Sequence, residues 1–260
     1  MPQLLLAVDT SGKNGSLGLA RTVPGHSIEI VDVVPLTGGA FSAQLVPEIA
    51  ALLRKHGYTK SDLGAFAVVS GPGSFTGLRV GLAAIKALAE GLQKPIVAIS
   101  LLEAIARSGS EQGRVLAVLD AGRGDVYVGD YLIGSEDPGQ VRMQSERLLS
   151  RNEFLAGATI AMEEGIPLAA AVWPGEDARR STGKAEGGVV VTPDTALAEV
   201  FRAALGNLGL RVERIEYPDS AVIARLGWER LQQGQTVRPE ELEANYIRQS
   251  DAEIFSKRGP

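Results

Sequence analysis

The chain has 260 residues, a formal net charge of −5, two histidines and no cysteine. The missing cysteines exclude disulfides, thiolate catalysis and sulfur-ligated zinc sites, and they favour a reducing, cytoplasmic compartment. The negative charge argues against a protein that grips nucleic acid over a broad surface by itself. No apolar run approaches the length that spans a bilayer, so we expect no membrane association.

The first hundred residues predict a compact α/β unit. "QLLLAVDT" is an apolar strand, Asn14–Gly15 suits a hairpin turn, and Ser42 is a candidate N-cap for the first helix. Apolar spacing favours the order strand, strand, strand, helix, strand, helix, strand, over residues 3–10, 16–21, 28–36, 42–57, 63–71, 79–92 and 94–100.

A second stretch with the same pattern as the N-terminal strand and turn begins at Arg114, in "RVLAVLDAGRGDVYVGDYLI". Like the first strand, which closes on Asp9, this stretch has an apolar strand that ends in an aspartate, Asp120, and then a Gly-containing basic turn and an alternating strand. The similarity predicts two related lobes, 1–110 and 111–260. In the second lobe we expect a strand and two helices, over residues 188–193, 194–209 and near 220–234. The last helix is expected to pack back on the N-terminal lobe, and the tail to end as a loose segment.

The stretch "SGPGSFTGLRVG" has the layout of a phosphate-binding loop between a strand and a helix. Its glycines would let backbone N–H groups approach an anion, and Ser74 or Thr76 could cap the helix that follows. The lysine and the terminal Ser/Thr of a GxxxxGK[ST] loop are missing, so a tight turn with a helix cap is favoured. We define the motif loop as Gly71, Pro72, Gly73, Ser74, Phe75, Thr76, Gly77, Leu78 and Arg79.

The predicted helix after this loop carries its charges in one sector, at Arg79, Lys86 and Glu90. Its other positions are apolar or small, which indicates burial on more than one side. Either its own lobe covers it, or it forms a subunit interface together with the preceding helix. The candidate interface residues are Leu45, Ile49, Leu52, Leu53, Gly77, Val80, Gly81, Ala84, Ala87 and Leu88.

The two strand-ending aspartates occupy a usual place for a catalytic or metal-binding carboxylate in an α/β sheet. A nucleotide clamped between two lobes would use Asp9, Thr10, Ser11, Gly12 and Asp120. The structural alternative is that each aspartate accepts backbone N–H bonds in a turn. The basic loop "ARRSTGKA" lacks the magnesium-binding Ser/Thr of a P-loop and is interpreted as flexible. The histidines, His26 and His56, offer no metal-binding pair.

"LAVDTS", "SGPGSFTGLRVGL" and "LDAGRGDVYV", in this order and spacing, resemble the TsaB (YeaZ) family of bacterial tRNA threonylcarbamoyladenosine biosynthesis proteins. "YIRQSDAEI" near the C-terminus is similar to that family's Tyr-Leu-Arg and Asp-Ala-Glu pattern. The resemblance is dense over residues 3–132 and sparse to 254. It implies the two-lobed actin-like ATPase (ASKHA) fold, in which each lobe is an RNase H-like mixed sheet with flanking helices.

Two departures from the family pattern stand out. Phe41 precedes Ser42 where the family commonly has a histidine, and Gly122–Arg123 stands where Arg-Arg is common. Roles that depend on those side chains are therefore not carried over to this chain.

The resemblance also implies a function. Members of this family are relatives of TsaD, the catalytic subunit that places a threonylcarbamoyl group on the adenosine beside the anticodon in tRNAs reading codons that start with A. They lack the histidine pair that holds TsaD's metal, and with only two unrelated histidines this chain lacks it too. The resemblance therefore implies a non-catalytic scaffold, with no catalytic residue and no metal site.

Partners follow from the same resemblance. The scaffold would bind and activate TsaD through two N-lobe helices, here residues 42–56 and 76–91, with the ATPase TsaE in the assembled complex. It would contact tRNA mainly through the complex, and form a homodimer when alone. No cofactor is required, and ATP or ADP at the junction with the partner is left open. The alternative function is a nucleotide-binding ATPase or phosphotransferase of the actin-like fold, with Asp9 and Asp120 for magnesium.

Overall fold

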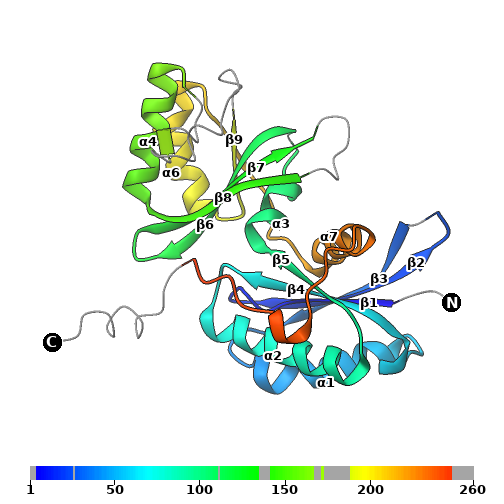
Figure 1. Cartoon of the computed structure of the whole chain (residues 1–260). Coiled ribbons are helices and arrows are strands. Elements are labelled where there is room, and N and C mark those ends of the chain that lie inside the picture. The colour runs from blue at the N-terminus through cyan, green and yellow to red at the C-terminus, as the bar shows by residue number, and fades with distance from the viewer. Residues whose placement is uncertain are drawn as a thin grey trace. The chain divides into compact units, whose positions relative to one another are not determined.

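The computed structural model describes residues 4–25, 27–110, 112–134, 141–166, 171–172 and 188–247. Within them the chain forms two compact units, one built from the residues up to Ala104 together with Pro218–Tyr246, the other from Ile105–Tyr217. Both units are α/β, as the sequence predicts (Figure 1). None of the described helices is long and apolar enough to cross a membrane.

The sheet of the first unit is mixed. Its strands are β1 (Leu4–Asp9), β2 (Gly15–Val23), β3 (Ser27–Leu36), β4 (Leu63–Gly71) and β5 (Ile96–Ser100). They lie in the order β3-β2-β1-β4-β5, with β1 antiparallel to β2 and parallel to β4. Every residue of β1 and β4 is buried. Both faces of the sheet centre are therefore covered, which explains the continuous apolar runs in these two strands.

Helices cover this sheet on both sides. α1 (Phe41–Lys55) and α2 (Phe75–Leu92) lie against one face and α7 (Ser220–Gln232) against the other (Figure 1). The α7 backbone comes so close that Gly18 has no room for a side chain beside Ser220, whose N–H donates to Ser16 Oγ at 2.9 Å. α3 (Leu101–Ser108) follows β5, and short 3-10 turns are η1 (Lys60–Asp62) and η4 (Pro239–Glu241).

The second unit repeats the strand order of the first. Its strands are β6 (Gly113–Gly122), β7 (Asp125–Ile133), β8 (Val141–Ser150), β9 (Val189–Thr192) and β10 (Arg211–Arg214), in the order β10-β9-β6-β7-β8. Like β1, β6 pairs antiparallel with the strand after it and parallel with the strand on its other side. α4 (Arg151–Glu164), α6 (Thr195–Leu205) and the turn η3 (Gly206–Leu208) complete the described part of this unit. The internal similarity seen in the sequence is thus a shared topology.

The structure departs from the sequence predictions in a few elements. α3, α4, β8 and β10 were not predicted. α1 begins at Phe41, and Ala40 rather than Ser42 is its N-cap, because the Phe41 side chain is buried against Gly15. The sequence assigned 111–260 to the second lobe with one helix packing back. In the structure all of Pro218–Tyr246 belongs to the first unit, since α7 and the segment after it pack on the first sheet and on α2.

Candidate functional site

The end of β1 and the motif loop are in direct contact. The Ser74 N–H donates to the Ser11 carbonyl at 2.7 Å, and Thr10 Oγ1 donates to the Gly77 carbonyl at 2.8 Å. Thr10 and Ser11 are both buried. The residues predicted to bind a nucleotide in the first lobe therefore lie against the start of α2, where their polar groups already have partners from this chain.

The glycines of the motif make this close contact possible. A Cβ on Gly77 would lie 2.0 Å from the Thr10 carbonyl oxygen, and one on Gly81 would lie 2.3 Å from Thr10 Oγ1. Gly73 has a φ of 158° and its Cβ would lie 2.5 Å from the Ser11 carbonyl oxygen. Ser74 is the N-cap of α2, as predicted, and its Oγ accepts from the Gly77 N–H at 3.3 Å. The β1 end thus fills the space on the Cβ side of these glycines.

Each strand-ending aspartate caps its own turn. Asp9 Oδ1 accepts from the N–H and the hydroxyl of Ser11, at 2.8 and 2.5 Å, and the carboxyl is buried. Burial raises the pKa of Asp9, and the two hydrogen bonds from Ser11 oppose that rise. In the second unit Asp120 Oδ1 accepts from the Gly122 N–H at 3.1 Å. These are the turn bonds that the structural alternative predicts.

Substituting Asp9 by Asn should change the pH dependence of stability. A carboxyl whose pKa is higher in the folded state favours folding below its unfolded value of 3.8 and loses that contribution as the pH rises through the folded pKa. The free energy of unfolding of the wild type, measured relative to that of Asp9→Asn, should therefore fall as the pH is raised from a value below 3.8 to values above it. Urea denaturation at a series of pH values measures this, with Asp120→Asn as the matched surface control. A pH-independent difference between wild type and Asp9→Asn would contradict it.

Four of the predicted interface residues are part of the hydrophobic core. Leu45, Ile49, Leu52 and Leu53 of α1 are 1–4% exposed and pack with the sheet of the first unit. Gly77 and Gly81 of α2 are also buried, against Thr10. These side chains stabilise the unit itself, so a partner would have to contact the other sides of the two helices.

The outward side of the two helices carries mostly small, uncharged residues, together with two exposed charged residues, Arg54 of α1 and Glu90 of α2. Residues three or four positions apart share one side of a helix. On α1 and α2, which pack side by side (Figure 1), the exposed or half-buried members are Ala43, Val46, Pro47, Ala50, Thr76, Val80, Ala83, Ala84, Ala87 and Leu88. Val46 is 55% exposed. We call this set the α1–α2 face; it contains four of the ten predicted interface residues: Val80, Ala84, Ala87 and Leu88.

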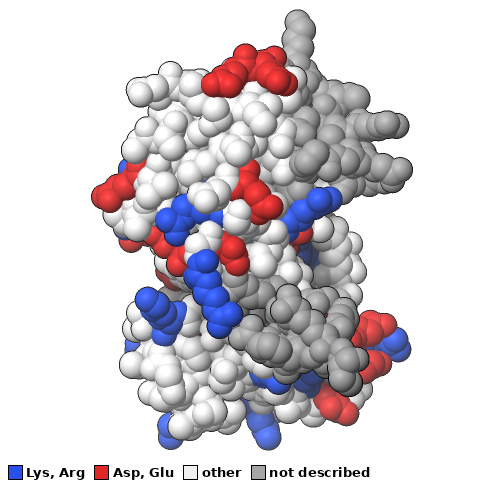
Figure 2. All heavy atoms as spheres, turned by 90° about the vertical axis from the view of Figure 1, so that its left-hand side faces the viewer, with Lys and Arg blue, Asp and Glu red and all other residues white. Residues whose placement is uncertain are grey.

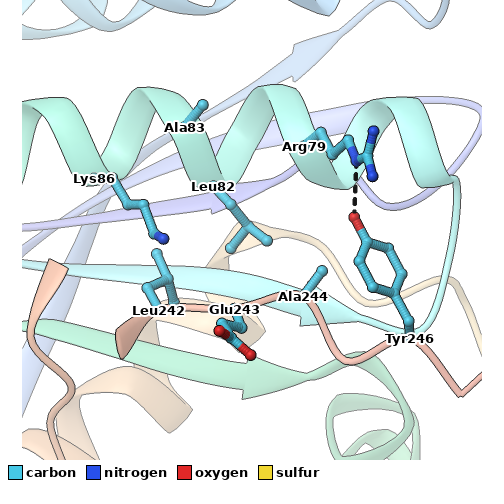
Figure 3. A pocket seen from close by; sticks show the side chains of 8 residues that line it. All are labelled: Arg79, Leu82, Ala83, Lys86, Leu242, Glu243, Ala244 and Tyr246. Atoms are coloured by element: carbon cyan, nitrogen blue, oxygen red, sulfur yellow. Dashed lines mark hydrogen bonds between the residues drawn. The ribbon is translucent and has the colours of Figure 1, made fainter. Parts of the chain in front are cut away.

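Sequence reasoning missed the contacts of the segment after η4. The Asn245 N–H donates to the Ser70 carbonyl at 2.7 Å, and a Cβ on Gly71 would lie 2.7 Å from the Asn245 carbonyl oxygen. The Tyr246 hydroxyl accepts from Arg79 Nε at 3.1 Å (Figure 3). Asn245 and Tyr246, the latter being the first residue of "YIRQSDAEI", therefore contact the motif loop and the strand before it, while the end of the tail that the sequence predicts to be loose lies outside the described residues. The available sequence signal was Leu242, an apolar residue between Glu241 and Glu243, which the structure buries.

The histidines and the basic loop take no part in the contacts between β1, the motif loop and α2 that the structure describes. His26 and the basic loop "ARRSTGKA" (178–185) lie outside the described residues. His56 Nε2 lies 2.9 Å from Asp32 Oδ2, and this bond, with one from Lys55, lowers the pKa of Asp32 to about 2. The described residues contain no group of three potential metal ligands. On the face that Figure 2 shows, described acidic and basic side chains are intermixed rather than gathered into one basic surface.

Comparisons with known proteins agree with these observations. A model of the TsaD family, described as tRNA N6-adenosine threonylcarbamoyltransferase, matches residues 33–255. The tRNA threonylcarbamoyladenosine biosynthesis protein TsaB of Bacillus subtilis (strain 168) is 36% identical over 128 residues, which cover 49% of this chain and 54% of that protein. TsaB of Escherichia coli (strain K12) is 32% identical over 132 residues, with 49% and 54% covered. The chain spans about half the length of these curated relatives.

A solved structure extends the likeness to nearly the whole chain. YeaZ from Pseudomonas aeruginosa superimposes with a TM-score of 0.64 at 22% identity, over 94% of this chain and 99% of the other. This likeness confirms the predicted fold class, the actin-like ATPase fold with two mixed sheets and flanking helices. The family model over residues 33–255 shows that the chain belongs to the TsaD family, and within that family its sequence is similar to the TsaB proteins.

Proposed function

We propose that this chain is a non-catalytic scaffold in tRNA threonylcarbamoyladenosine biosynthesis, which binds and activates TsaD through the α1–α2 face. The curated relatives that it resembles are named as biosynthesis proteins for this modified nucleoside. The modification would be that of the adenosine beside the anticodon in tRNAs reading codons that start with A. We place this work in the cytoplasm, with TsaE in the assembled complex and tRNA bound mainly through the complex.

The observation that carries the proposal is the α1–α2 face itself. Small, uncharged side chains across two adjacent helices let the helices of a partner approach closely. Exposed apolar surface of this kind marks interaction sites in soluble proteins. The polar groups of Thr10 and Ser11, which an enzymatic function would need free for a nucleotide, are instead engaged with the chain's own α2.

TsaD is the partner that fits this face best. The TsaD model matches residues 33–255 and so includes α1 and α2. A protein with counterparts of these two helices can pack them against the α1–α2 face as a four-helix bundle. The same reasoning predicts a homodimer when TsaD is absent, since a second copy offers an equivalent pair of helices. The scaffold needs no cofactor of its own, and the TsaD junction is the place where ATP or ADP would sit.

Light scattering after size exclusion tests the proposal. When the purified chain is mixed with TsaD from the same cells, we expect a new species whose mass is the sum of one copy of each. Two proteins that elute separately would contradict the proposal. Micromolar binding of Mg-ATP to the isolated chain, lost in Asp9→Ala, would instead favour the ATPase or phosphotransferase alternative.

A further inference from the structure

A hollow of about 300 Å³ lies between α2 and residues 242–246 of the first unit (Figure 3). Its apolar lining comes from Leu82 and Ala83 on α2 and from Leu242 and Ala244 on the C-terminal segment. In Figure 3 the side chains of Leu82 and Lys86 point toward that segment. A hollow of this size with a mainly apolar lining and a few polar groups is suited to one or two side chains of a ligand.

Two cations stand at this hollow without a carboxylate partner among the described residues: Arg79 and Lys86. Arg79 is held in place, because its guanidinium lies 3.7 Å from the centre of the Phe75 ring and its Nε donates to the Tyr246 hydroxyl. Aromatic contacts of this kind fix the direction of a guanidinium without neutralising its charge. The arrangement is thus a preoriented positive charge beside an apolar floor, in a chain whose net charge is −5.

The spacing of the two cations restricts the ligand. Arg79 and Lys86 are two helical turns apart on the same side of α2, a rise of about 10 Å along the axis. Two residues one turn apart in a polyproline II segment have side chains on one side and about 9 Å between them. A polyproline II peptide can therefore present one carboxylate to each cation, and the two residues between them flank that side, where an apolar side chain can contact the edge of the apolar floor.

We propose that this hollow binds an acidic peptide segment of a partner protein, with two carboxylates one polyproline II turn apart and an apolar residue between. Glu243, which also lines the hollow and has no partner among the described residues, can accept a backbone N–H of the bound segment. RNA is disfavoured, because the described lining offers only two cations to neutralise its phosphates. Ala83 belongs both to this lining and to the α1–α2 face, so peptide binding is measured on the isolated chain, without TsaD.

Fluorescence polarisation of a labelled Glu-Pro-Leu-Glu peptide against the full chain tests the proposal. We expect saturable binding that weakens with added salt and is lost when both glutamates are replaced by glutamine. Arg79→Gln and Lys86→Gln should each weaken binding about threefold, and the double variant about tenfold. Arg54→Gln, which removes an exposed arginine of α1, is the matched control and should leave binding unchanged.

Three results would overturn the proposal: no binding of the peptide, equal binding of its glutamine form, or binding that the double variant retains. A labelled oligouridylate serves as the competing probe. If it binds with the same dependence on Arg79 and Lys86 while the peptide does not, the hollow is an RNA site. Because Arg79 also contacts Tyr246, thermal unfolding of each variant is measured alongside. Lys86→Gln, which removes no hydrogen bond or ion pair with the described residues, decides the outcome.

Discussion

Gly77→Ala should lower the free energy of unfolding by about 3 kcal/mol, a large effect for the addition of one methyl group. The new Cβ would lie 2.0 Å from the Thr10 carbonyl oxygen, a backbone atom that cannot move without shifting the end of β1. Relieving the clash would also disturb the bond from Thr10 Oγ1 to the Gly77 carbonyl and the one from the Ser74 N–H to Ser11. Both contacts join β1 to α2, so the damage falls on the core of the first unit.

Gly91→Ala is the matched control, because it makes the same change in the same helix. A Cβ at Gly91 meets no atom within 4 Å. Alanine is the better helix former by about 1 kcal/mol, so this variant should be as stable as the wild type or slightly more stable. Urea denaturation of the two variants measures the difference. If both have the stability of the wild type, the motif glycines do not serve the close contact with β1.

Ala87→Arg should weaken binding to TsaD about a hundredfold while leaving the fold intact. Ala87 is exposed in the centre of the outward side of α2, so a larger side chain there meets solvent in the isolated chain. In a packed interface the arginine would be buried without a partner, which costs about 3 kcal/mol and corresponds to that loss of affinity. Ala84 is a poorer test, since it packs partly against the core and its substitution would also affect folding. Calorimetric titration with TsaD gives the two dissociation constants.

Ala203→Arg controls for the substitution itself. Ala203 is an exposed alanine in α6, which belongs to the second unit, whereas the α1–α2 face belongs to the first. The Ala203→Arg variant should bind TsaD with the same affinity as the wild type. The interface assignment fails if Ala87→Arg also binds like the wild type, or if both variants lose binding to the same extent.

The sequence predicted the architecture well because strand runs and turn residues are local signals. The apolar runs that end in Asp9 and Asp120 predicted two related lobes, and both became first strands of sheets with the same order. β8 was missed because it alternates weakly and lies at the sheet edge, and β10 because it has only four residues.

The contacts of the site were harder to predict, because they join residues far apart in the chain. The glycine pattern indicated a close approach at Gly77 but not that Thr10, 67 residues earlier, would make it. The apolar stripe of α1 suggested an interface with a partner. In the structure Leu45 and Ile49 of this stripe are instead buried against the sheet of the first unit. The small residues of α2 did predict part of the α1–α2 face, at Val80, Ala84, Ala87 and Leu88. Its α1 residues became visible only from side-chain exposure.

The most direct test of the scaffold proposal is mass spectrometry of tRNA nucleosides from cells depleted of this protein and supplied with variants. Depletion should remove threonylcarbamoyladenosine, and the wild type and Ala203→Arg should restore it, whereas Ala87→Arg should not. Unchanged threonylcarbamoyladenosine after depletion would contradict the assigned pathway. Full restoration by Ala87→Arg would contradict docking through the α1–α2 face.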